Sequence, residues 1–444
     1  MEIEKLREIL KNSGIVGAGG AGFPTFVKID ERANTIIMNC AECEPLLQLH
    51  KQLLEQHANV ILETFQMIAD TVGAEEIVIG IKKEYKATIR ALNIYLEFYP
   101  KIKLHLLPEV YPMGDEIVMI YEVTGKVIKP GGLPIDEGIA VFNVETVYNI
   151  YKAITDGEPV ASKLVSVVGE VEHPITVRVP IGCEIKDVVA LAGKVTVEEP
   201  IYFIGGPMMG SIGYEDTLVT KTTNAVIVLP NQHILVQRKQ SNTSIDLKRA
   251  ASSCCQCQMC TDLCPRHALG HPIEPHKFMR SAANQDFQDA SVFLDTYFCS
   301  SCGICELFSC PQSLSPRTLI AEYKSGLRQA GVKPPSDRIA KEIKVSREYR
   351  KVPENRLEAR LGLSKYNKPA PLDDTLVPMK KVRILLGQHI GALAIACVNK
   401  GDFVKIGDMV AEPGKGLSVA IHASVEGKVI EVTSKHIMIL AENQ

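Results

Sequence analysis

Two groups of closely spaced cysteines constrain this chain more than any other feature of its sequence. The first group reads C-x2-C-x2-C-x3-C-P and consists of Cys254, Cys257, Cys260 and Cys264. The second has the same order with one additional residue before its last cysteine, and it consists of Cys299, Cys302, Cys305 and Cys310. Bacterial proteins that carry two [4Fe–4S] clusters use this spacing. The sequence therefore predicts two cysteine-ligated [4Fe–4S] clusters and a role in electron transfer.

The same rule predicts which cysteines share a cluster. Three cysteines two residues apart ligate three corners of one cluster, and the distal cysteine before the proline reaches the other cluster. One cluster is therefore assigned to Cys254, Cys257, Cys260 and Cys310, and the other to Cys264, Cys299, Cys302 and Cys305. Cys255 breaks the pattern and is predicted not to be a ligand. A pair of structural zinc sites is the alternative, but zinc modules separate two C-x2-C pairs by a long spacer or include histidines.

Composition narrows the remaining classes of function. The chain has 444 residues, of which 46% are hydrophobic and 23% charged, with a net charge of −3. No long basic stretch is present, which argues against nucleic acid as the main ligand. The N-terminus lacks the apolar core of a signal peptide, and no apolar run is long enough to cross a bilayer. We therefore expect a cytoplasmic protein without a membrane span.

Hydrophobic patterning predicts a multidomain chain. Residues 1–158 alternate strand and helix patterns, which favours an α/β domain with a mostly parallel sheet. Residues 160–235 are rich in short strands and suit a β-grasp domain, whereas residues 245–330 place the cysteines in a helical, ferredoxin-like domain. Residues 331–376 are charged and contain prolines, and they are predicted to be a linker with one or two surface helices. Short strands with glycine turns in residues 378–444 predict a small β barrel-sandwich.

A glycine-rich segment near the N-terminus is a second candidate site. Residues 14–25 read GIVGAGGAGFPT. Without side chains, backbone N–H groups can approach a phosphate or a flavin ring closely. A helical pattern precedes this segment, so it lacks the strand-first arrangement of the dinucleotide fingerprint. A loop that only makes tight turns is the alternative.

Three further motifs give this segment a specific meaning. They are NCAECEP from residue 39, YPMGDE from residue 111 and NVET from residue 143. Together with the glycine segment and Lys28, they resemble the FMN- and NADH-binding flavoprotein subunit of respiratory complex I. The same wider family includes the C subunits of Rnf complexes and the cobalamin reductases of propanediol-utilisation microcompartments (PduS type).

The resemblance implies an FMN and NADH site built from these motifs. Its residues would be Gly17, Gly19, Gly20, Gly22, Lys28, Asn39, Tyr111, Gly114, Asp115, Glu116 and Asn143, with Glu42 and Glu44 beside the reacting groups. The chain departs from complex I at three places. Complex I has an acid where this chain has Ala41, an asparagine where it has Phe142, and two glutamates where it has Asp115 and Glu116.

The rest of the chain resembles the same family. Residues 163–230 are similar to the soluble-ligand-binding β-grasp (SLBB) module, and residues 382–444 to a lipoyl-type barrel-sandwich. This last module stands first in Rnf subunits but last in the cobalamin reductases, as here. The resemblance therefore implies electron transfer from NADH through FMN and two [4Fe–4S] clusters to a corrinoid, with an adenosyltransferase as partner and a bacterial microcompartment as the cellular location. An Rnf-type relay subunit that reduces a protein partner is the alternative.

Overall fold

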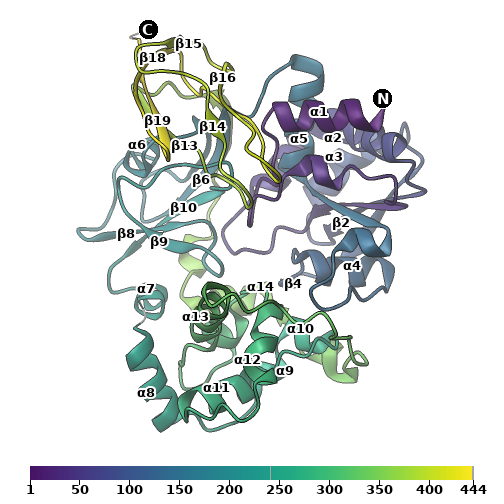
Figure 1. Ribbon diagram of the computed structural model, residues 1–444, viewed down its shortest axis with the longest axis vertical. Coiled ribbons are helices and arrows are strands. Elements are labelled where there is room, and N and C mark those ends of the chain that lie inside the picture. The colour runs from purple at the N-terminus through teal and green to yellow at the C-terminus, as the bar shows by residue number, and fades with distance from the viewer. Residues whose placement is uncertain (241, 443–444) are drawn as a thin grey trace.

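A four-stranded parallel sheet organises the N-terminal part of the chain. The computed structural model describes residues 1–240 and 242–442, and Figure 1 shows this sheet beside the β-structure of the middle part. Its strands are β1 (Thr35–Cys40), β2 (Glu76–Lys82), β3 (Ile102–Leu107) and β5 (Ile139–Asn143), in the order β3-β2-β1-β5. The central strand β1 is buried on both faces, as its unbroken apolar sequence predicts.

Helices cover this sheet and connect its strands. They are α1 (Ile3–Asn12), α2 (Leu49–Val72), α3 (Lys86–Leu96), α4 (Glu116–Thr124) and α5 (Val144–Tyr151), with short turns η1 (Thr25–Lys28), η2 (Pro134–Glu137) and η3 (Lys152–Asp156). The chain runs outward from β1 through β2 to β3, and then returns to place β5 on the other side of β1. Strand order therefore reverses between β1 and β5. In open parallel sheets, ligands bind beyond the carboxyl ends of the strands at such a switch point.

The middle part contains a mixed six-stranded sheet. Its strands are β6 (Ser162–Gly169), β7 (Ile175–Pro180), β8 (Pro200–Ile204), β9 (Ser211–Gly213), β10 (Ala225–Pro230) and β12 (Leu372–Leu376), in the order β12-β7-β6-β10-β8-β9. The short helix α6 (Ile185–Ala190) contributes Ile185 and Val188 to its core. Strands β6 to β10 lie within residues 160–235, which the patterning predicts to be rich in short strands, but β12 comes from the predicted linker.

The cysteine groups lie in a helical part at one end of the molecule (Figure 1). Its elements are α7 (Ile234–Lys239), α8 (Thr243–Ser253), α9 (Met259–Asp262), α10 (Pro265–Ala268), α11 (Pro275–Ala283), α12 (Ser291–Leu294), η4 (Asp295–Phe298), η5 (Ile304–Phe308) and α13 (Pro316–Gln329). Phe278, Phe293 and Tyr323 pack against one another with ring centroids 5.2–6.0 Å apart. This aromatic cluster holds the short helices together.

The segment 331–376 differs from the predicted linker, because it is a strap that pairs with two other parts. After the turn η6 (Val345–Tyr349), β11 (Val352–Pro353) pairs with β4 (Val110–Tyr111) of the N-terminal part, and β12 pairs with β7. Between them, α14 (Glu354–Leu361) and η7 (Ser364–Tyr366) bury Leu357, Leu361 and Tyr366. Leu357 and Leu361, four residues apart in α14, make one face of this charged helix hydrophobic.

The C-terminal part consists of two small sheets. One has the order β13-β19-β18-β15, with β13 (Lys381–Leu385), β15 (Phe403–Val404), β18 (Gly427–Val432) and β19 (His436–Ala441). The other has the order β14-β16-β17, with β14 (Ile395–Ala396), β16 (Met409–Glu412) and β17 (Ile421–His422). Val382 and Ile384 of β13 share one hydrophobic core with Val165 and Val177 of the six-stranded sheet. Among residues 1–240 and 242–442, no helix combines the length and the apolar character that crossing a bilayer requires.

Candidate iron–sulfur and flavin sites

The structure places the eight cysteines of the two groups around two separate pockets. The first pocket has about 370 Å³ of empty space, part of which opens to solvent, and is lined by Cys254, Cys257, Cys260 and Cys310 together with Cys255. The second has about 330 Å³ and is lined by Cys264, Cys299, Cys302 and Cys305. Each group thus sends its last cysteine to the pocket of the other group, which is the arrangement predicted from spacing. The identity of the ligands stays a prediction.

The two cysteine loops repeat the same unusual backbone conformation. Gln256 and Ser301 occupy equivalent positions between the first and second cysteine, and both are left-handed, with φ of 52° and 61°. Gln258 and Gly303 are equivalent after the second cysteine, with φ of 63° and 82°. Alternation with left-handed residues turns successive N–H groups toward one side, which forms the kind of nest that surrounds anions and iron–sulfur clusters.

A π-helical turn accommodates the extra residue of the second group. In the first group, the Leu263 N–H donates to the Met259 carbonyl at 3.1 Å, an ordinary four-residue spacing. In the second group, the Ser309 N–H donates to the Ile304 carbonyl at 2.9 Å across five residues. The wider turn takes up one residue. Cys310 therefore reaches its pocket despite the longer spacing in sequence.

The donor set and its burial fit a [4Fe–4S] cluster in each pocket. Burial raises the pKa of the Cys260 thiol to about 12 and that of the Cys264 thiol to about 11. Thiolates in such surroundings need a positively charged partner, which cluster iron supplies. Among the described residues, no three His, Cys, Asp or Glu side chains converge closely enough to hold a single metal ion. Instead, the thiols of the predicted ligands line a cavity in each pocket.

The glycine loop crosses the carboxyl end of the parallel sheet. The Ala18 N–H donates to the Thr146 hydroxyl at 3.0 Å, which fixes the loop to the start of α5. Gly20 is exposed and left-handed, with φ of 60°, and no atom lies within 4 Å of the position that a Cβ would occupy. The backbone at Gly20 is therefore open to a ligand. A phosphate or a planar flavin ring can approach the backbone of this loop. The residues present therefore fit an FMN, which has both groups.

The polar residues predicted for the flavin gather near this loop. Asn39 and Asn143 are partners in the register of β1 and β5, at the switch point. The Asn39 amide donates to the Gly114 carbonyl at 2.9 Å, and the Asn143 side chain caps α5. The Lys28 ammonium donates to the Val141 carbonyl at 2.7 Å and pairs with Glu116 at 2.9 Å. A cation is thus held beside the loop, as a phosphate site requires.

The departures from complex I have structural explanations. Phe142 is 1% exposed and packs in the core of the N-terminal part, and Ala41 is also buried. Asp115 caps the start of α4 and pairs with Arg266 of α10 at 2.8 Å. The Asp115 carboxylate therefore connects the N-terminal part to the first cysteine group. The sequence offered no signal for this contact, because Arg266 lies in another motif.

Glu42 and Glu44 bind backbone amides. The Glu42 carboxylate accepts from the His50 N–H at 3.1 Å, in the first turn of α2. The two Glu44 oxygens accept from the N–H groups of Met208 and Met209, each at 2.8 Å. Burial raises the pKa of the Glu44 carboxyl. The structure therefore gives both carboxylates a positioning contact, and their predicted role beside the reacting groups stays a prediction.

A loop of the middle part, residues 205–210, is built around Glu44. A Cβ on Gly206 would overlap the Glu44 carboxylate, so any larger residue there would displace this side chain. The Lys239 ammonium donates to the carbonyls of Met208 and Gly210 at 2.8 and 2.9 Å. Met208 is fully buried and belongs to the same hydrophobic cluster as Cys302. This loop therefore links the NCAECEP motif to the second cysteine pocket.

Replacing Glu44 by glutamine is expected to weaken this link. The amide NH₂ of glutamine cannot accept, so one of the two N–H groups, of Met208 or of Met209, loses its partner. We expect the free energy of unfolding to fall by about 1–3 kcal/mol, measured by chemical denaturation of protein with matched cofactor content. Glu198→Gln, at an exposed position of the middle part, is the control. Equal stability of the two variants would contradict the positioning role.

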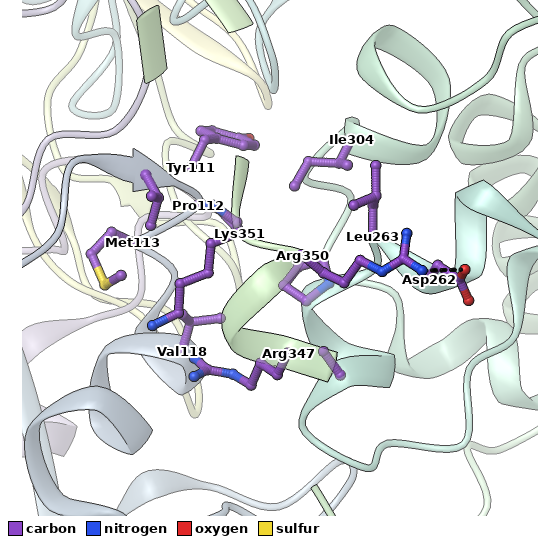
Figure 2. A pocket seen from close by; sticks show the side chains of 13 residues that line it. Tyr111, Pro112, Met113, Val118, Asp262, Leu263, Ile304, Arg347, Arg350 and Lys351 are labelled. Carbon is purple, nitrogen blue, oxygen red and sulfur yellow. Dashed lines mark ion pairs between the residues drawn. The ribbon is translucent and has the colours of Figure 1, made fainter. Parts of the chain in front are cut away.

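Tyr111 joins the N-terminal part to the second cysteine loop. Its hydroxyl donates to the Cys302 carbonyl at 2.6 Å, and the ring is 2% exposed. Figure 2 shows Tyr111 at one side of a pocket with Leu263 and Ile304 opposite. Ile304 also lines the second cysteine pocket. The Tyr111 side chain thus connects the YPMGDE motif, predicted to bind the flavin, with the loop that carries the predicted cluster ligand Cys302.

Sequence reasoning missed the residues that brace the glycine loop from outside. The buried Lys221 ammonium donates to the Gly14 carbonyl at 2.6 Å and to the Ala420 carbonyl at 3.1 Å. Burial lowers the pKa of Lys221 to about 7. The Gln388 side chain accepts from the Lys221 N–H at 3.1 Å, and the Ile390 N–H donates to the Ala21 carbonyl at 3.1 Å. The middle and C-terminal parts therefore hold both ends of the loop.

Comparisons with known proteins agree with this division of the chain. Residues 10–152 match the Nuo51 FMN-binding domain, and residues 164–211 the SLBB domain. Residues 253–315 match the 4Fe-4S dicluster domain, and residues 365–443 the RnfC barrel sandwich hybrid domain. These matches confirm a multidomain chain with flavin-type, iron–sulfur, SLBB and barrel-sandwich parts.

Two of the relatives cover nearly the whole chain. It is 40% identical over 446 residues to the cobalamin reductase PduS of Citrobacter freundii, covering 99% of this chain and 97% of that protein. It is 40% identical over 447 residues to the cobalamin reductase PduS of Salmonella typhimurium, with the same coverage. The C component of the ion-translocating oxidoreductase complex of Edwardsiella ictaluri is 32% identical over 266 residues, which are 59% of this chain and 32% of that protein.

Proposed function

This chain belongs to the family of the cobalamin reductases PduS, and we propose that it transfers electrons from NADH through FMN and two [4Fe–4S] clusters to a corrinoid. It is a flavin and iron–sulfur electron-transfer oxidoreductase. Bound FMN would accept two electrons as hydride and release them one at a time, which one-electron clusters require. The observation that carries the proposal is the union of a glycine loop with left-handed residues and two pockets, each lined by four predicted cysteine ligands, in one chain.

The chain's own residues would order the centres. Gly20 leaves its backbone accessible, and Lys28 with Asn39 and Asn143 provides the polar groups around the loop. Tyr111 fixes the flavin motif against the second cysteine loop. The second pocket is therefore proposed to receive electrons from the flavin side, since its loop contacts that side directly.

A relay to a protein partner is the second candidate function. The likeness to a component of an ion-translocating complex supports it. In that case, the chain would pass electrons to another protein and would have no turnover with a corrinoid. We propose an adenosyltransferase as the partner for the corrinoid route, in the cytoplasm and inside a bacterial microcompartment.

The experiment that tests the proposal supplies the purified protein anaerobically with NADH, cob(III)alamin and an adenosyltransferase. We expect NADH to bleach the visible absorbance of the protein and adenosylcobalamin to form. Omission of NADH is the control, and reduction of artificial dyes is not sufficient, because low-potential clusters reduce many dyes. If NADH bleaches the protein while the corrinoid stays oxidised and a protein acceptor is reduced, the relay function replaces the corrinoid function.

A further inference from the structure

The surface around the pocket in Figure 2 combines basic and apolar side chains. Residues 333–351 contain seven basic and three acidic residues, a local net charge of +4 in a chain whose net charge is −3. Lys333, Lys341 and Lys344 are exposed and make no ion pair within the part of the chain that the structure describes. Val345 is 93% and Tyr349 is 88% exposed. Exposed apolar side chains and cations without an ion partner therefore lie on the same short segment.

This basic surface is held rigidly against the cysteine-bearing part. The Lys341 N–H donates to the Gly270 carbonyl at 2.9 Å, and the Lys344 N–H donates to the Ala268 carbonyl at 3.0 Å. Gly270 has φ of 86°, and a Cβ there would overlap the Lys341 carbonyl, so the two segments approach closely. The backbone that carries the free lysines is therefore fixed, whereas their ammonium groups remain available.

The pocket beside this surface shares a lining residue with the second cysteine pocket. Its walls include Leu263 and Pro265, which flank Cys264, and Ile304, which precedes Cys305. Ile304 also lines the second cysteine pocket, so one side chain is common to both. Arg350 borders the opening and pairs with Asp262 at 3.3 Å (Figure 2). An acceptor seated here would contact Ile304, whose side chain also lines the second cysteine pocket.

We propose that residues 333–351 and the adjoining pocket form the docking surface for a protein electron acceptor with acidic groups around its own redox centre. The inference rests on the second candidate function, the relay to a protein partner, and deepens it by placing the exit of electrons. Free cations attract such a partner and steer it into register, and Val345 and Tyr349 supply apolar contact. The acids Asp337, Glu342 and Glu348 interrupt the cations, which suits a matched protein rim better than a uniformly anionic membrane. Each transfer moves one electron from the reduced protein to the acceptor, with no bond made or broken.

The test uses two haem proteins of opposite charge as acceptors. The protein is reduced with a stoichiometric amount of dithionite, and the reduction of ferric to ferrous cytochrome b5, which is acidic, and cytochrome c, which is basic, is followed by stopped flow. For the double variant Lys341→Glu/Lys344→Glu we expect cytochrome b5 reduction to slow about tenfold at low ionic strength. Its rate should also lose most of its salt dependence, whereas cytochrome c reduction should not slow.

Two further variants make the result specific. Lys400→Glu/Lys435→Glu makes the same change of charge at exposed positions in the C-terminal part, at the other end of the molecule (Figure 1), and should reduce cytochrome b5 like wild type. Tyr349→Ser alters the apolar contact without a charge and should also slow the reaction. Iron content and circular dichroism verify that every variant is folded and loaded.

An unchanged rate and salt dependence for Lys341→Glu/Lys344→Glu would overturn the proposal. A second result would also overturn it: the wild type sediments with phosphatidylserine vesicles, the double variant does not, and both reduce cytochrome b5 at the same rate. The surface would then bind lipid and not a protein acceptor. Dithionite bypasses NADH and no corrinoid is present. Failure of NADH or corrinoid to react would therefore refute the proposed function without touching this docking surface.

Discussion

Replacing Cys310 by serine is expected to remove the cluster held by the first cysteine group, because Cys310 lines the pocket of Cys254, Cys257 and Cys260. Iron and inorganic sulfide should fall from about eight to about four of each per chain. Cys254→Ser should cause the same loss, and the same electron paramagnetic resonance signal should disappear from the dithionite-reduced protein in both variants. Metal and sulfide analysis after anaerobic purification measures the effect.

Cys255 provides the matched test of the ligand register. It lines the same pocket as the four predicted ligands, so the structure makes it their only rival among the cysteines of that pocket. Cys255→Ser should retain about eight iron per chain, as should Cys397→Ser at an exposed position of the C-terminal part. Loss of a cluster in Cys255→Ser together with an intact Cys254→Ser would show that the predicted register is wrong by one residue.

The parts of the fold that were predictable are those with a local pattern. The apolar runs at β1, β2 and β5 are continuous, and strands buried on both faces leave this signature. The exchange of Cys264 and Cys310 between pockets followed from spacing alone, since cluster geometry limits which thiols can reach. The strap was not predictable in this way. Its strand β11 has only two residues and its strand β12 only five. The strands with which they pair, β4 and β7, are distant in sequence.

The predicted flavin residues illustrate a different limit. Motifs identified Asn39, Glu44 and Tyr111, but not the groups that these side chains contact. The Glu44 carboxylate meets the Met208 and Met209 amides, and the Tyr111 hydroxyl meets the Cys302 carbonyl. Backbone partners carry no residue-type signal, because every residue has the same N–H and C=O groups. Contacts between domains therefore appeared only in the structure.

Substituting alanine for Gly20 is expected to reduce FMN affinity more than it reduces stability. With φ of 60°, alanine costs about 1–2 kcal/mol of backbone strain. No protein atom lies within 4 Å of the new methyl group, so any further effect must come from a ligand that occupies that space. A steric clash between the added methyl group and the flavin costs about 1–3 kcal/mol, which corresponds to a rise in the FMN dissociation constant of roughly 5-fold to 150-fold.

Gly73→Ala is the control that separates strain from ligand contact. Gly73 ends α2 with φ of 77°, and no atom lies within 4 Å of its Cβ position either. Both variants should therefore unfold at similarly lowered denaturant concentrations, but only Gly20→Ala should lose flavin. The measurements are bound flavin per chain and titration of the flavin-free protein with FMN, followed by fluorescence quenching. Equal FMN affinity in the two variants would place the flavin away from Gly20. Wild-type protein that binds FAD, or no flavin at all, would argue against the flavin site itself, because the open backbone at Gly20 would then serve only the turn.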